Sequence, residues 1–128
     1  MSLIVLLVAA VSCHDGGLED DIIGKWEIQE STCFGCPVMF TTYPEGNGNI
    51  LIFKSNGAYE RRENNVAVFK GKYSIKKSEV CDKEDDALHT NESPGTTSDI
   101  VSIESGKLQL NTPPCLADGG ITVYRRLK

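Results

Sequence analysis

From Ile22 to the end of the chain, apolar and polar residues alternate with a period of two. Gly, Asn, Asp or Pro interrupt this alternation at about the 8–12-residue spacing that is typical of β-sandwiches and barrels. The period of 3.6 residues that indicates an amphipathic helix is not evident in this part of the sequence. The sequence therefore predicts an all-β domain with little or no helix.

The alternation predicts eight short strands, at residues 25–29, 38–43, 49–54, 58–63, 66–76, 99–104, 107–111 and 120–128. Asn56 and Gly57 predict a type I′ hairpin turn, because both central residues of that turn need a positive φ. Residues 77–97 predict a long, irregular, acidic loop. Strands that follow one another in this way favour a single small up-and-down antiparallel β-barrel, since closure removes exposed sheet edges.

The composition suits one soluble domain and excludes one class of partner. The chain has 128 residues, of which 40% are hydrophobic and 24% charged. The net charge of −5 argues against nucleic acid, because sequence-independent binding to phosphates needs clustered Lys and Arg. The basic residues instead occur as pairs that we expect to be solvated or used in packing, at Arg61-Arg62, Lys76-Lys77 and Arg125-Arg126.

An uncharged apolar run ends at Ala10-Val11-Ser12-Cys13, and it is shorter than the ~20 residues that a membrane-spanning helix needs. This ending resembles a bacterial lipobox, which implies a lipoprotein signal peptide over residues 1–12 and a lipid anchor on Cys13. It departs from the usual pattern at Ala10, where Leu is common, and no Lys or Arg precedes the run. An ordinary secretory peptide and a buried strand are the alternatives.

Residues 14–21 are rich in Gly, Asp and Glu, so residues 13–21 predict a flexible tether between the anchor and a barrel domain at residues 22–128. Acidic tethers of this kind resemble the surface-export signals of Bacteroidetes lipoproteins. The resemblance implies the bacterial cell envelope, with an outer-membrane lipoprotein that faces the periplasm or the cell surface. The expected partner is the membrane, through the lipid.

Four cysteines follow Cys13, and an even number in a small exported domain predicts two disulfides. Three pairings are possible; we favour Cys33–Cys36 with Cys81–Cys115, because the Cys-x-x-Cys ring can close locally. All four cysteines fall in odd-numbered loops of the predicted eight-strand meander, which places them at one end of the barrel. No helix pattern follows Cys36, and Cys81 and Cys115 stand alone, so we expect neither a redox site nor a zinc site, and no cofactor.

Gly24-Lys25-Trp26 on the first strand, a following β meander and an arginine on the last strand resemble the lipocalin (calycin) pattern. That family implies a barrel floor made by Gly24 and Trp26, with Arg125 or Arg126 packed across the indole ring. Over residues 22–128 the chain is similar to small lipocalin-like lipoproteins of the Bacteroidetes type. The domain is shorter than typical lipocalins, so side chains can fill a small barrel completely.

The main expectation for function is binding of a small hydrophobic molecule, or of an envelope partner, at the cysteine-rich end. Phe34, Met39, Phe40 and Tyr43 are its candidate ligand-binding residues.

The alternative is a protein-interaction module that uses the loop from Ser78 to Thr97 around a filled barrel. Cys33 to Cys36 and the hairpin after it resemble the N-terminal barrel of NlpE-type envelope-stress lipoproteins, which are tied to copper and surface sensing. We do not expect an enzyme, because most carboxylates fall in predicted loops with no apolar surroundings to raise a pKa, and nothing in the sequence places a nucleophile beside His89.

Overall fold

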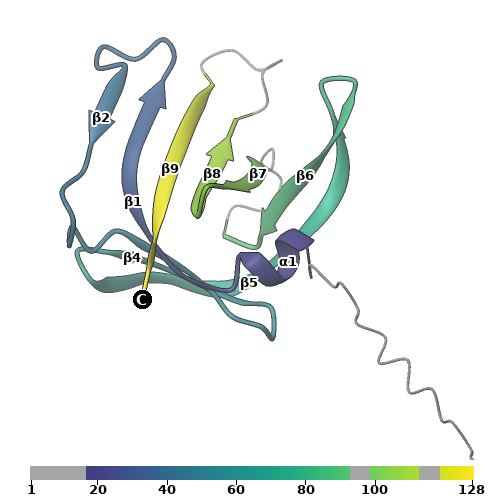
Figure 1. The fold of residues 1–128 in the computed structure, drawn as a ribbon, viewed down its shortest axis with the longest axis horizontal. Helices are drawn as coiled ribbons and strands as arrows, with labels where there is room; N and C mark the ends of the chain where they lie inside the picture. The colour runs from purple at the N-terminus through teal and green to yellow at the C-terminus, as the bar shows by residue number, and fades with distance from the viewer. Residues whose placement is uncertain (1–16, 93–98, 113–118) are drawn as a thin grey trace, which may run out of the picture.

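The computed structural model describes residues 17–92, 99–112 and 119–128 (Figure 1). Cys13 and Cys115 lie outside these ranges. The described residues form one short helix and nine strands: α1 (Gly17–Asp21), β1 (Gly24–Cys33), β2 (Phe40–Thr42), β3 (Ile50–Phe53), β4 (Ala58–Glu63), β5 (Val66–Val80), β6 (Lys83–Thr90), β7 (Asp99–Glu104), β8 (Lys107–Asn111) and β9 (Gly120–Leu127).

The strands form a closed antiparallel barrel of eight strands, with β2 as an additional strand. Each barrel strand pairs with the next, and β1 closes the barrel by pairing along its length with β9. The first half of β1 pairs with β3, and its second half pairs with β2. β2 and β3 therefore lie on the same side of β1, one after the other along its length. The predicted all-β, up-and-down barrel is confirmed.

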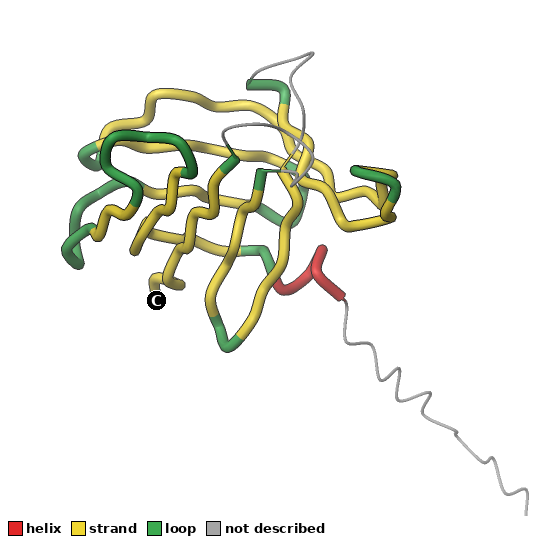
Figure 2. Tube along the Cα trace, turned by 90° about the horizontal axis from the view of Figure 1, so that it is seen from above, coloured by secondary structure: helices red, strands yellow, loops and turns green. Residues whose placement is uncertain are grey.

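The prediction of an irregular loop is wrong for residues 77–90, because β5 continues to Val80 and β6 follows at Lys83–Thr90. The last part of that predicted loop, residues 93–97, lies outside the described residues. Cys81 and Asp82 turn the chain with φ angles of 54° and 60°, although neither residue is a typical hairpin signal. The hairpin extends away from the other strands in both views (Figures 1 and 2). Because β2 and β3 both run antiparallel to β1, and so in the same direction, the alternation of loops no longer places Cys81 beside Cys33 and Cys36.

The predicted type I′ turn at Asn56-Gly57 is also wrong, because Gly57 has a positive φ of 84° and Asn56 does not. Gly57 N instead donates to Lys54 O at 3.0 Å, and Lys54 N donates to Ala58 O. Paired positive φ angles, as a type I′ turn requires, occur at Asn64-Asn65, at Cys81-Asp82 and at Ser105-Gly106.

Residues 17–21 differ from the predicted flexible tether, because they form the single turn of α1. Ile22 N donates to Leu18 O at 3.0 Å, Leu18 packs against the core, and Ile22 is fully buried. Two apolar side chains four residues apart therefore hold this turn on the barrel. In the part of the chain that the structure describes, no helix has the length and apolar character needed to cross a membrane.

The core consists of the side chains that point inward from alternate strand positions, together with Ile22 from the turn between α1 and β1. It contains Ile22, Trp26, Leu51, Phe53, Tyr59, Ile75, Leu88, Val101, Leu108 and Leu110. Its aromatic centre is Phe53, whose ring centroid lies 5.3 Å from that of Tyr59 and 4.9 Å from that of Tyr73. Packed side chains therefore fill a large part of the barrel interior.

Candidate functional site: the pocket between β1, β4 and β9

One end of the barrel is sealed around Trp26, which is fully buried. Its Nε1 donates to Ile22 O at 2.8 Å. The guanidinium of Arg126 lies 4.1 Å from the indole centroid, and it also donates to the carbonyls of Asp21 and Ile23. Both members of the stack therefore hydrogen-bond the backbone that leads into β1. Of the two arginines that were candidates for the position, Arg126 occupies it.

Gly24 is required beside this stack for two reasons. Its φ is +137°, a conformation that side chains rarely adopt. A Cβ placed on it would also lie 2.9 Å from Arg126 Nη1. The Gly-x-Trp pattern therefore has a local steric basis in this chain.

Arg125 points to the opposite face of β9 and pairs with Glu27, a carboxylate that is only 3% exposed. Arg125 Nε lies 3.2 Å from Glu27 Oε1, and the backbone amides of Gly46 and Gly48 donate to the same carboxylate. Arg125 Nη2 also donates to Tyr43 O at 3.3 Å. These contacts hold the connection between β2 and β3 on the barrel, and with it Tyr43.

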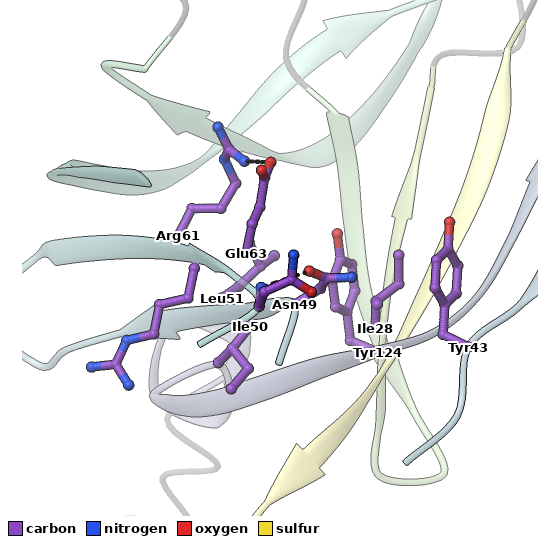
Figure 3. Close-up of a pocket in the computed structure, with 10 residues that line it drawn as sticks. Ile28, Tyr43, Asn49, Ile50, Leu51, Arg61, Glu63 and Tyr124 are labelled. Atoms are coloured by element: carbon purple, nitrogen blue, oxygen red, sulfur yellow. Dashed lines mark hydrogen bonds and ion pairs between the residues drawn. The ribbon is translucent and has the colours of Figure 1, made fainter. Parts of the chain in front are cut away.

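A pocket of about 390 Å³ opens above the core, one inward-facing position beyond the sealed end. Ile28 follows Trp26 on the inner face of β1, and Tyr124 precedes Arg126 on the inner face of β9. Figure 3 shows Ile28, Tyr43 and Tyr124 pointing to the same side of the sheet. The complete lining is Ile28, Tyr43, Asn49, Ile50, Leu51, Arg61, Arg62, Glu63, Asn64 and Tyr124.

Arg61 enters this pocket from β4 and is held by two carboxylates. Its Nε donates to Glu92 Oε2 at 2.7 Å, and its Nη2 lies 2.5 Å from the same oxygen. Its Nη1 donates to Glu63 Oε1 at 2.5 Å. These bonds raise the pKa of Arg61 above its usual value. The Tyr59 hydroxyl also hydrogen-bonds Glu92, and burial is the main cause of the raised pKa of Tyr59.

Asp99 lies at the start of β7 and shares its inward face with Val101. Burial raises the pKa of its carboxyl. Burial also raises the pKa of Tyr124, and the charges of Asp99 and Tyr43 raise it further. Asp99 itself is not among the residues that line the pocket.

Of the four predicted ligand-binding residues, Tyr43 lines the pocket. Phe34, Met39 and Phe40 do not, and they are exposed by 49%, 55% and 55%. They lie on and before β2, where β1 extends past its pairing with β3, so their side chains meet solvent instead of the interior.

The predicted Cys33–Cys36 disulfide is confirmed, with 5.5 Å between the two Cα atoms. Cys81 is also disulfide-bonded. Cys115, its predicted partner, lies outside the described residues. Within residues 17–92, 99–112 and 119–128, no group of three His, Cys, Asp or Glu residues is arranged to hold a metal ion.

Sequence reasoning missed the charged residues of the pocket. Tyr59 and Arg61 are two residues apart on β4 and must share a face. This spacing indicates that Arg61 faces the interior like Tyr59, but two adjacent arginines are more typical of solvated side chains. Comparison with models of protein families, with curated proteins and with solved structures gives no match.

Proposed function

We propose that the protein is a binding protein, without catalytic activity, that takes a small amphipathic molecule into the pocket beside Tyr43 and Tyr124. The observation that carries the proposal is the pocket itself. Its volume of about 390 Å³ lies within the ~300–1,000 Å³ range that is usual for small-molecule sites. Apolar side chains of Ile28 and Leu51 and polar groups of Asn49 and Asn64 share its lining, which suits an amphipathic ligand.

We also propose that the protein is anchored in the bacterial envelope through a lipid on Cys13. The support is the sequence ending Ala10-Val11-Ser12-Cys13 after an apolar run. Mass spectrometry of the mature N-terminus tests this part. A diacylglyceryl mass on Cys13 supports the anchor, and an unmodified Cys13 contradicts it.

The binding proposal can be tested with N-phenyl-1-naphthylamine, an uncharged probe whose fluorescence rises in apolar surroundings. We expect saturable binding to the purified protein. Ile28→Trp should fill the pocket and abolish the fluorescence rise. Val68→Trp places the same side chain at a position that is already 46% exposed, and it should leave binding unchanged. Equal binding by both variants would contradict the proposal.

The second candidate, a protein-interaction module, is favoured by a different observation. Phe34, Val38, Met39 and Phe40 are all about half exposed or more, within a hairpin connection that the Cys33–Cys36 disulfide closes. Exposed apolar groups that gather in this way often mark contact surfaces. Because these two cysteines are oxidised, they offer no thiolates to copper. A Phe34→Ser and Met39→Ser double variant that loses a pulled-down envelope partner would support this candidate.

A further inference from the structure

The charged side chains that line the pocket are paired within the protein. Each of the three guanidinium nitrogens of Arg61 contacts a carboxylate oxygen of Glu63 or Glu92. Figure 3 shows the Arg61 guanidinium joined to Glu63, the carboxylate of the lining. An anionic head group would have to displace a carboxylate from Arg61, and a cationic one would have to compete with Arg61 for Glu63.

Arg62, the second arginine of the lining, is paired as well. Its Nε donates to a carboxylate oxygen of Glu60. The other oxygen of that carboxylate lies 3.8 Å from Lys70 Nζ. Neither arginine of the pocket therefore offers a guanidinium that lacks a carboxylate partner.

The uncharged polar side chains of the lining, in contrast, have hydrogen-bonding groups to spare. Asn49 Oδ1 accepts from Asn64 N at 3.2 Å, and Asn49 Nδ2 donates to no other residue that the structure describes. Among those same residues, neither the side-chain amide of Asn64 nor the hydroxyl of Tyr124 has a hydrogen-bond partner. These groups can bind a ligand without the loss of a contact inside the protein.

The apolar side chains of the pocket lie beside these groups. Ile28 on β1 and Tyr124 on β9 are partners in the barrel wall, and Figure 3 shows both side chains pointing to the same side of the sheet. Leu51 on β3 adds a further apolar side chain to the lining. An apolar chain can therefore lie along the wall while its head group reaches the amides and the hydroxyl.

We propose that the ligand of this pocket carries no charge and has a hydroxyl or amide head group on a short apolar chain. Asn49, Asn64 and Tyr124 hydrogen-bond the head group, and Ile28 and Leu51 contact the chain. This inference rests on the proposed binding function and adds the chemistry of the head group to it.

Three probes with the same ten-carbon chain test the proposal: 1-decanoylglycerol, decanoate and decyltrimethylammonium. Each is titrated below its micelle concentration by displacement of N-phenyl-1-naphthylamine. We expect 1-decanoylglycerol to bind about tenfold more tightly than either charged probe, because a charged head group would leave water without gaining an unpaired opposite charge.

Two variants test the residues that bind the head group. Asn64→Gly removes the amide at a φ of 51°, which glycine adopts readily, and Tyr124→Phe removes the hydroxyl alone. We expect each to weaken binding of 1-decanoylglycerol about three- to tenfold, the effect of one hydrogen bond, and to leave the affinity for N-phenyl-1-naphthylamine unchanged. Asn65→Gly is the matched control, because Asn65 has a φ of 65° in the same turn and does not line the pocket.

The outcomes separate the two proposals. Binding of decanoate or decyltrimethylammonium as tight as that of 1-decanoylglycerol would overturn the uncharged ligand and leave the pocket in place. Unchanged affinity for 1-decanoylglycerol in both variants, or an equal loss in Asn65→Gly, would do the same. If the protein binds neither N-phenyl-1-naphthylamine nor any of the three probes, the binding function itself is overturned. Retained binding of N-phenyl-1-naphthylamine shows that a variant is folded.

Discussion

Glu27 on β1 and Arg125 on β9 lie directly opposite each other in the barrel wall, and 3.2 Å separates Glu27 Oε1 from Arg125 Nε. The next residue, Arg126, points to the other face and stacks on Trp26. Because strand residues alternate between faces, two adjacent arginines perform two different tasks. One seals the barrel end, and the other holds the segment that carries Tyr43 to the pocket.

Loss of the Glu27–Arg125 pair should weaken both the fold and the pocket. We expect Glu27→Ala to lower the free energy of unfolding by about 2–3 kcal/mol, somewhat less than the ~3–5 kcal/mol for a fully buried pair, because Arg125 is 21% exposed. Urea denaturation measures this loss, and N-phenyl-1-naphthylamine affinity should fall with it. Glu45→Ala is the control: Glu45 also faces Arg125, at 3.6 Å, but is 86% exposed, so its loss should cost under about 0.5 kcal/mol.

The stack of Arg126 on Trp26 should require the planar guanidinium. Arg126→Lys keeps the charge but cannot reproduce the stacking together with the donation to the carbonyls of Asp21 and Ile23. We expect a loss of about 1–2 kcal/mol and a red shift of Trp26 fluorescence as water reaches the ring. An unchanged emission maximum and an unchanged denaturation midpoint would show that the stack is dispensable.

Gly24 should tolerate alanine less well than another glycine with positive φ. At Gly24 the new Cβ meets both an unfavourable φ and Arg126 Nη1, whereas Gly46 has a φ of +78° and no atom within 4 Å of the Cβ position. We expect Gly24→Ala to cost about 2–3 kcal/mol and Gly46→Ala about 1 kcal/mol. Equal losses in chemical denaturation would argue against the steric role of Arg126.

Asp99 should make the protein less stable at neutral pH than an uncharged side chain would. Burial raises the pKa of its carboxyl in the folded state above the unfolded value of about 3.8, so the ionised form is penalised by folding. The penalty is present above the folded pKa and disappears as the pH falls below the unfolded pKa. Asp99→Asn should therefore have the higher melting temperature at pH 7, and the two proteins should converge near pH 3.5. A less stable Asp99→Asn at pH 7 would contradict this.

The features that sequence predicted correctly are those set by local rules. Period-two alternation predicted the barrel, and the short spacing of Cys33 and Cys36 predicted their disulfide. The tryptophan-arginine contact was predicted as a choice between Arg125 and Arg126. Strand alternation then determines which of them faces Trp26, once the register of β9 against β1 is known.

The features that sequence missed depend on contacts between distant segments. β6 begins with acidic residues that resemble a solvated loop, and its turn at Cys81 and Asp82 lacks the usual Gly or Asn. The partner that makes Arg61 a pocket residue is Glu92, 31 positions away and beyond β6. Nothing in the sequence around Phe34 and Phe40 indicates that β1 extends past its pairing with β3, which leaves these two side chains in solvent.

The most direct test of the account is to locate the bound probe by ¹H–¹⁵N NMR during titration with N-phenyl-1-naphthylamine. The account predicts that amide shift changes concentrate at the pocket wall, at Ile28, Tyr43, Asn49, Asn64 and Tyr124. Changes concentrated instead at the exposed connection around Phe34 and Met39, with the pocket wall unaffected, would contradict it.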